Sequence, residues 1–225
     1  MRSLALDSAT SRCSIAVLDG EVLAAHRGDD AAAGQGDGLP LAVAAALDAA
    51  GMAIATLDRL AVTIGPGRFT GLRAGLAFMR GLALATGKPL VGVTTLEALA
   101  HGARGRAEPD ETILACIDSR RAELFFQRFA ADGSALSAPF AATPEALVAL
   151  LPAAPRILAV GEHAARVASV LAAVRAGVRA HESTVDAADV ARLAATRAAP
   201  AVPPAPLYIH PPATTAPRRA VGLAS

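Results

Sequence analysis

The sequence is short of the residues that mark several protein classes. Its 225 residues include no tryptophan, one tyrosine and only two cysteines, and the net charge is +1. Cys13 and Cys116 both lie in apolar runs without the spacing of a disulfide framework, so we expect reduced core thiols and a cytoplasmic protein. A net charge this small gives no global electrostatic argument for nucleic-acid binding.

Uninterrupted hydrophobic runs are also absent. The most apolar stretch, 39–57, is broken by Pro40, Asp48 and Gly51. An aspartate at the centre of a bilayer costs roughly 2.5–3.5 kcal/mol, so this stretch is expected to be an ordinary helix ending near Gly51. The apolar start of the chain is interrupted at Asp7, and no signal peptide is expected.

The length suits one large domain or two small ones, and an internal echo favours a duplication. Apolar strands at 4–7 and 113–117 are each followed by Asp-Ser, a polar turn, a second strand and an Asp-Gly hairpin turn. We therefore expect two related lobes, each opening with a β-meander. The expected boundaries are 1–105 for the first lobe, 106–199 for a smaller second lobe and 200–225 for a Pro-rich segment with a disordered tail.

Hydrophobic periodicity and turn residues predict the remaining elements. Further strands are expected at 13–18, 21–24, 60–64, 90–93, 123–129 and 157–161. Helices are expected from Pro40, over 72–86, over 95–103, and at 144–151, 164–173 and 185–197. Thr70 and Thr95 are the expected N-caps of two helices, Gly87 is a C-terminal stop, and 29–38 is an expected loop.

The stretch 65–75, Gly-Pro-Gly-Arg-Phe-Thr-Gly-Leu-Arg-Ala-Gly, lies between a strand and a helix. Glycines before a helix can cradle phosphate, but the spacing fits neither G-x-G-x-x-G nor a P-loop, and the loop has no lysine. Gly71 and Gly75 lie one helical turn apart and could admit a partner helix closely. They could equally serve the packing of the chain on itself, and spacing alone leaves these two readings open.

Several motifs together carry a resemblance to a known family. They are Leu-Asp-Ser-Ala-Thr at 6–10, the 65–75 block, Gly-Val-Thr-Thr-Leu-Glu-Ala-Leu-Ala at 92–100, Ile-Asp-Ser-Arg-Arg-Ala-Glu-Leu at 117–124 and Pro-Leu-Tyr-Ile at 206–209. In this order the chain resembles the TsaB (YeaZ) family of bacterial accessory proteins of tRNA threonylcarbamoyladenosine synthesis. The resemblance implies an α/β fold of the actin/Hsp70/sugar-kinase (ASKHA) type with a reduced C-terminal lobe.

The resemblance also implies the partners. These are a TsaD-type catalytic subunit or a second copy of the chain, a TsaE-type ATPase that joins the pair, and tRNA reached through the complex. The implied contact is the helix after the Gly-rich block. Its expected interface residues are Gly71, Leu72, Gly75, Leu76, Phe78, Met79 and Leu82. On this interpretation, Gly75→Arg should block association and leave the monomer folded.

In kinase-like relatives of this fold, the turn after the first strand of each lobe holds nucleotide phosphate. The matching positions here form a vestigial site of Asp7, Ser8, Thr10, Asp118 and Gly161. Neither turn contains the glycines that a phosphate cradle needs. We therefore expect a non-catalytic subunit with no tightly bound cofactor, while ATP or ADP at a partner interface stays open. Arg120 and Arg121 are expected to be solvated turn residues.

No catalytic or metal-binding residue is predicted. The histidines lack a ligand spacing, and no G-x-S-x-G elbow is present. The alternative functions are an independent ATPase or small-molecule kinase, and a protease-like enzyme. Arg68, Arg73 and Arg80 are too few for a basic patch. Gln35 and His210 depart from the family pattern. The histidines are His26, His101, His163, His181 and His210.

Overall fold

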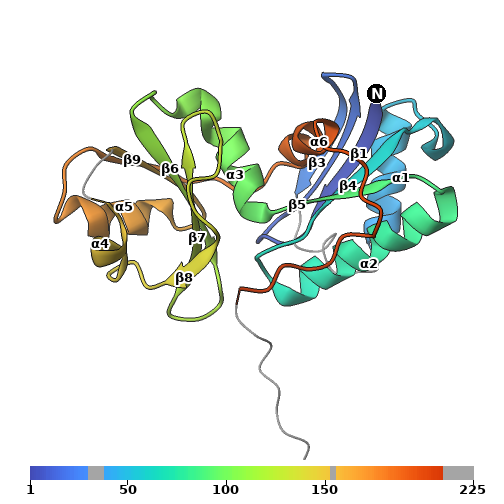
Figure 1. Ribbon diagram of the computed structural model, residues 1–225. Coiled ribbons are helices and arrows are strands. Elements are labelled where there is room, and N and C mark those ends of the chain that lie inside the picture. The colour runs from blue at the N-terminus through green and yellow to red at the C-terminus, as the bar shows by residue number, and fades with distance from the viewer. Residues whose placement is uncertain (30–37, 153–155, 210–225) are drawn as a thin grey trace, which may run out of the picture.

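The computed structural model describes residues 1–29, 38–152 and 156–209, which form two lobes with one sheet each (Figure 1). Outside these residues lie nearly all of the predicted loop at 29–38, as well as Gln35, His210 and the tail. Within them, no helix has the length and apolar character that crossing a bilayer requires.

The first lobe follows the predicted order of strands and helices closely. Gly87, with φ of 68°, ends α2 as expected, whereas the helix begins at Phe69 rather than Leu72 and its N-cap position is Arg68 rather than Thr70. The elements are β1 (Arg2–Asp7), β2 (Cys13–Asp19), β3 (Val22–Asp29), α1 (Leu39–Ala49), a 3-10 turn (Ile54–Thr56), β4 (Arg59–Thr63), α2 (Phe69–Thr86) and β5 (Leu90–Val93).

The second lobe repeats this order with a shorter third strand and shorter helices α4 and α5. The helix that leads into it is capped by Thr94 rather than Thr95, through a capping box with Glu97. The elements are α3 (Thr95–Ala103), a 3-10 turn (Arg104–Arg106), β6 (Glu111–Asp118), β7 (Leu124–Ala130), β8 (Phe140–Ala142), α4 (Leu147–Leu150), β9 (Arg156–Gly161), α5 (Ala164–Ala172), β10 (Val178–His181) and α6 (Ala187–Ala195).

The two sheets have the same topology. Their strand orders are β3-β2-β1-β4-β5 and β8-β7-β6-β9-β10, each with an antiparallel meander followed by two parallel strands. The expected pair of related lobes is therefore confirmed. So is the reduction of the second lobe, because α4 has four residues where the corresponding α1 has eleven.

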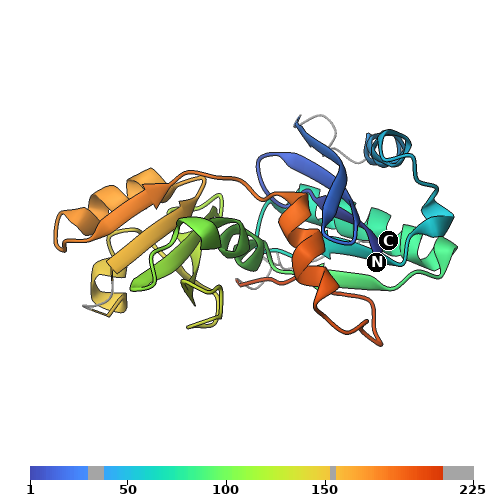
Figure 2. The ribbon, with the colours of Figure 1, turned by 90° about the horizontal axis from the view of Figure 1, so that it is seen from above.

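The lobes exchange one helix each. Figure 2 shows α3 and α6 side by side between the sheets. α3 precedes the second sheet and packs on β6, whereas α6 follows that sheet and returns to pack on β1 and β2 of the first. One hydrophobic cluster consequently runs from Ala61 and Val93 through Leu96 and Val190 to Val160. α1 and α2 cover the outer face of the first sheet, over a separate cluster.

Candidate functional site

Asp7 ends β1 at the point where the resemblance implied a phosphate site, and its carboxylate is closed off by its own lobe. Oδ1 accepts hydrogen bonds from Thr63 Oγ1 at 2.6 Å and the Ala9 amide at 3.1 Å, and Oδ2 accepts one from Thr10 Oγ1 at 2.7 Å. The side chain is fully buried. Burial raises the pKa of Asp7 to about 6, against the lowering effect of these hydrogen bonds.

The Gly-rich block packs directly beneath the turn that follows Asp7. A Cβ atom placed on Gly67 would lie 2.2 Å from the Ala9 carbonyl oxygen, and one on Gly71 would lie 2.1 Å from that of Ser8. At Gly75 it would meet Ser8 Oγ at 2.0 Å. The Ser8 hydroxyl donates to the Gly71 carbonyl at 2.9 Å. These glycines are therefore needed for a contact within the chain, which is one of the two readings that their spacing left open.

The rest of the expected interface set also faces inward in the single chain. Leu72, Leu76 and Met79 are almost completely buried, and Phe78 and Leu82 are half-buried against the same cluster. Gly75→Arg could not leave the monomer folded, so that expectation is corrected. Whether α2 is an interface stays a prediction, and it must rest on the outward-facing residues of the helix. These are Phe69, Arg73, Ala77, Arg80, Gly81, Leu84 and Ala85.

The turn after Asp118 is held by local contacts. The Arg120 amide donates to Asp118 Oδ1 at 2.7 Å, and the Arg120 guanidinium lies 3.2 Å from Oδ2. Arg120 has a φ of 60°, a conformation that non-glycine residues adopt infrequently. His163 Nε2 lies 3.9 Å from the same carboxylate. Arg120 is thus paired with its own turn, where the sequence had suggested only a solvated arginine.

Gly161 and Glu162 stand at the end of β9 in the second lobe, and Glu162 contacts the turn that follows Asp7 in the first. Gly161 has a φ of 127°, and a Cβ there would lie 2.0 Å from the Cys116 carbonyl oxygen. Glu162 Oε1 accepts a hydrogen bond of 3.0 Å from the Ser11 amide of the first lobe. A carboxylate of the chain thus occupies a backbone N–H that a phosphate would need. With glycine-free turns and a closed Asp7, these residues do not fit a nucleotide phosphate.

Sequence reasoning missed a polar pocket of about 230 Å³ near the start of α6. In it, His26 Nε2 lies 2.9 Å from Asp186 Oδ1 and 3.4 Å from Ser14 Oγ. A catalytic triad needs its serine and its acid on different ring nitrogens, whereas here both face the same one. Ser14 Oγ also accepts a hydrogen bond from the Ala187 amide at 3.0 Å. The arrangement does not suit a serine hydrolase.

The other candidates for chemistry have structural surroundings. His101 Nδ1 lies 2.9 Å from Asp189 Oδ1, between α3 and α6. Burial raises the pKa of Cys13 to about 11 and that of Cys116 to about 12, so both thiols stay protonated at neutral pH. Throughout the described ranges, no three His, Cys, Asp or Glu side chains lie close enough together to hold a metal ion.

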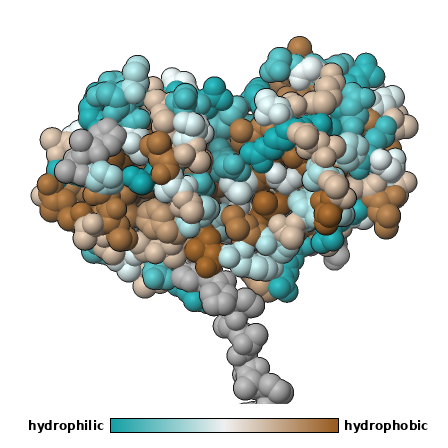
Figure 3. Space-filling view, in the orientation of Figure 1, coloured by the Kyte–Doolittle hydropathy of each residue, from teal (hydrophilic) through white to brown (hydrophobic). Residues whose placement is uncertain are grey.

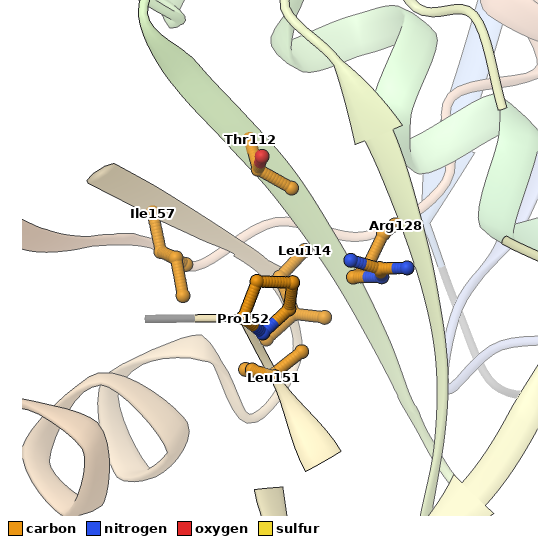
Figure 4. A pocket seen from close by; sticks show the side chains of 6 residues that line it. All are labelled: Thr112, Leu114, Arg128, Leu151, Pro152 and Ile157. Atoms are coloured by element: carbon orange, nitrogen blue, oxygen red, sulfur yellow. The ribbon is translucent and has the colours of Figure 1, made fainter. Parts of the chain in front are cut away.

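A second, apolar pocket lies on the outer side of the second sheet (Figure 4). Its volume of about 10 Å³ is too small for any ligand larger than water. The labelled side chains are Thr112, Leu114, Arg128, Leu151, Pro152 and Ile157.

The Pro-rich segment after α6 crosses the first lobe and reaches the start of α2 (Figure 1). The Leu207 amide donates to the Ile64 carbonyl at 2.7 Å, and Pro204 packs on Gly92. At its end, the Tyr208 hydroxyl accepts a hydrogen bond of 2.9 Å from Arg73 Nε.

Beside that bond, the Arg73 guanidinium carbon lies 3.7 Å from the centre of the Phe69 ring. The Phe69 and Tyr208 rings are 6.1 Å apart. Phe69, Arg73 and Tyr208 are called the aromatic platform below. Its parts come from distant sequence positions, the 65–75 block and the Pro-Leu-Tyr-Ile motif, and nothing in the sequence indicated that the two would meet.

Comparison with known proteins gives consistent matches. Residues 31–185 match the family model described as TsaD: tRNA N6-adenosine threonylcarbamoyltransferase. The chain is 36% identical over 132 residues to the Escherichia coli tRNA threonylcarbamoyladenosine biosynthesis protein TsaB, which covers 59% of this chain and 56% of that protein. The matched part thus spans little more than half of this curated relative.

Solved structures cover more of the chain. YeaZ from Pseudomonas aeruginosa has a TM-score of 0.72 and 27% identity, and the match covers 86% of this chain and 90% of that one. The activator of 2-hydroxyisocaproyl-CoA dehydratase from Clostridium difficile, solved with bound ADPNP, has a TM-score of 0.53 at 11% identity over 86% of this chain and 94% of that one. The latter likeness shows the fold alone, and the expected actin-like ASKHA fold is confirmed.

Proposed function

Because the chain belongs to the TsaD family of tRNA N6-adenosine threonylcarbamoyltransferases, among its TsaB (YeaZ) members, we propose that it is an accessory subunit of tRNA threonylcarbamoyladenosine synthesis and not the transferase itself. Its partner is a TsaD-type catalytic subunit, which a TsaE-type ATPase joins in the cytoplasm. The pair modifies N6 of adenosine 37 in tRNA, and this chain supplies interface energy and positions the partner.

The observation that carries the proposal is the closure of the nucleotide region from within. Asp7 has both oxygens occupied, and Glu162 takes the Ser11 amide. A catalyst of this fold would need those groups free for a metal ion and phosphates. The chain has instead kept the two lobes without the phosphate-binding turns, which suits a subunit that contributes surface and not chemistry.

The surface we assign to the partner is the outer stripe of α2, defined as Ala77, Gly81, Leu84 and Ala85. Leu84 is 88% exposed, and a Cβ on Gly81 would have no neighbour within 4 Å. The stripe therefore has the small, apolar character that lets a second helix approach closely. In Figure 3, the densest hydrophobic area of the visible face lies at the lower left, over the second lobe, and hydrophobic and hydrophilic residues are mixed at the lower right, where Figure 1 places α2.

The same stripe could also join two copies of this chain. A homodimer through α2 would then compete with the partner complex, because one surface cannot bind both at once. We expect the TsaD-type complex to displace any homodimer when both proteins are mixed.

The alternative of an independent ATPase or kinase makes a different prediction. Mg-ATP would then stabilise the isolated chain by mass action, by about 2.7 kcal/mol at 100 times its dissociation constant. We expect no such rise in the thermal midpoint, because Asp7 and Glu162 already hold the contacts that phosphate would make. A large shift with turnover would favour the catalytic alternative.

The direct test uses Ala77→Arg, with Ala165→Arg as the matched control on α5 of the second lobe. Both positions are exposed helix alanines. Ala77→Arg is expected to weaken binding to the TsaD-type protein of the same organism by about 30-fold or more, the effect of removing an interface hot spot. Calorimetric titration and size-exclusion chromatography measure it. If folded Ala77→Arg binds as tightly as Ala165→Arg, the stripe is not the interface.

A further inference from the structure

The charges of this nearly neutral chain are divided very unevenly along the sequence. Residues 59–96 and 190–225 contain nine of the 21 Lys and Arg and none of the 20 Asp and Glu. The remaining 151 residues hold twelve basic and twenty acidic residues, a net charge of −8. Net charge alone conceals this division, which gives two segments of the chain the electrostatic character of a polyanion-binding surface.

The fold brings the first segment and the described part of the second, 190–209, together at the aromatic platform. Phe69 and Arg73 belong to the first segment and Tyr208 to the second, and they are joined by the Arg73–Tyr208 hydrogen bond. Four of the nine cations bind backbone carbonyls or acidic side chains at shorter distances, and Arg68 Nη1 makes a longer, exposed contact of 3.5 Å with the Ser11 carbonyl. The four are Arg59, Lys88, Arg192 and Arg197.

The cations of α2 are placed differently. Arg68, Arg73 and Arg80 are exposed, and no acidic side chain is recorded within salt-bridge distance of any of the three in the described part of the chain. Arg68 begins the helix, and Arg80 lies seven residues beyond Arg73, on the same side. Positive charge therefore extends along α2 from the platform.

The platform leaves part of both aromatic residues exposed to solvent, while the Arg73 guanidinium covers one face of the Phe69 ring. The Phe69 side chain is 52% exposed and Tyr208 is 38% exposed, although both are held in place. Exposed aromatic rings beside arginine are the means by which proteins stack unpaired nucleotides, with the phosphates neutralised by neighbouring cations. A ring fixed by a hydrogen bond and a guanidinium stack loses little conformational entropy when a base settles on it.

We propose that the aromatic platform binds an unpaired base of the tRNA substrate, with Arg68 and Arg80 contacting the adjacent phosphates. This inference rests on the proposed function, since that function supplies tRNA as the ligand. It adds a direct RNA contact to a subunit otherwise expected to meet tRNA through its partner. The platform and the outer stripe lie on the same helix, and Phe69 and Leu84 are about 22 Å apart along its axis, so the base and the partner can bind together. Arg80 lies on the face of the stripe, between Ala77 and Leu84, so its phosphate contact would be made where RNA and partner meet.

The test measures fluorescence anisotropy of a labelled anticodon stem-loop RNA containing adenosine 37, with the isolated chain and with its TsaD-type complex. The variants are Phe69→Leu, Tyr208→Leu and Arg73→Gln, because leucine keeps apolar volume but removes the stacking face. Tyr208→Phe keeps the ring, and Arg166→Gln removes one exposed charge from the second lobe as a control. Thermal midpoints verify that each variant is folded.

Each leucine variant is expected to weaken RNA binding by about 5- to 150-fold, the measured range for losing one stacked base. Tyr208→Phe and Arg166→Gln should lose much less. Arg73→Gln should also weaken binding, because it removes the contacts that hold the two rings. Arg68→Gln should reduce the slope of log affinity against log salt by about 0.7, because Arg68 is assigned to one phosphate. These changes should appear in the complex whether or not the isolated chain binds strongly.

Two results would overturn the inference. One is RNA binding by the complex that the leucine variants leave unchanged. The other is loss of the TsaD-type partner, and not of RNA, in those variants, which would make the platform a protein contact. The two proposals can fail separately. If Ala77→Arg still forms the complex, the outer stripe is not the partner interface. If the leucine variants form an intact complex, any change in their affinity for RNA reports on the aromatic platform alone.

Discussion

Two alanine substitutions in one helix should change stability in opposite directions. Gly75 and Gly81 both lie within α2, six residues apart. A Cβ on Gly75 would lie 2.0 Å from Ser8 Oγ and 3.4 Å from Leu6 Cδ2, whereas one on Gly81 would meet nothing within 4 Å. Comparing the two variants therefore separates the gain in helix propensity, which both share, from the steric cost of the Cβ, which arises only at Gly75.

The magnitudes follow from three contributions. Alanine in place of glycine inside a helix gains about 0.8–1 kcal/mol at either position. At Gly75, inserting an atom into a packed contact costs about 1–3 kcal/mol. Displacing the Ser8 hydroxyl from the Gly71 carbonyl costs about 1 kcal/mol more. Gly75→Ala should thus destabilise by about 1–3 kcal/mol and Gly81→Ala should stabilise by up to about 1 kcal/mol.

Urea denaturation followed by circular dichroism gives the two free energies of unfolding. Two more variants, Ser8→Ala and its combination with Gly75→Ala, complete a double-mutant cycle, and the combination removes the clashing oxygen and should recover part of the loss. The resulting coupling energy of about 0.5–3 kcal/mol would be favourable, as expected for residues in contact. The reasoning is refuted if Gly75→Ala is as stable as the wild type, or if the double variant is merely additive.

Two further predictions concern buried groups of the first turn and the core. Because the folded pKa of Asp7 is raised to about 6 from an ordinary value near 3.8, the folded state holds this proton more tightly than the unfolded state. The stability that this proton contributes is complete below about pH 4 and is lost between pH 4 and 6. The free energy of unfolding of the wild type should therefore fall by about 3 kcal/mol over that window in urea titrations, and Asp7→Asn should abolish the fall. A fall that persists in the variant would point to another group. Burial raises the pKa of Cys13 to about 11 and that of Cys116 to about 12, so both thiols should resist iodoacetamide in the native protein at pH 8 and react once it is unfolded. Mass spectrometry measures the alkylation. Rapid alkylation of either cysteine in the native protein would contradict the burial described.

Local patterns in the sequence predicted most of the fold. The apolar run before Gly65 and the alanine-rich stretch before Gly87 fixed β4 and α2, and the Asp-Ser echo at Asp7 and Asp118 predicted the duplication. β8 and β10 were not predicted. Phe140–Ala142 is only three residues long, and the two central residues of Val178–His181 are exposed, so neither has the apolar run by which a strand is found.

The candidate site was harder to predict because its contacts join distant parts of the chain. Small residues at Gly71 and Gly75 have the same spacing whether they face a partner or Ser8, which lies 63 positions from Gly71. Only the fold decides between the two. Similarly, Tyr208 meets Arg73 across 135 positions, so the aromatic platform had no local signal. The uneven distribution of carboxylates was readable from the sequence, but total charge concealed it.

The exchange of α3 and α6 bears on how such a molecule can be divided. A cut at the expected boundary between residues 105 and 106 would leave the first sheet without α6, and the second without α3. Each fragment would expose an apolar sheet face, so neither half is an independent folding unit. The duplication therefore preserves, within a single chain, the reciprocal exchange that a domain-swapped dimer makes between two. A one-lobed ancestor with this topology would have needed a second copy of itself to fold.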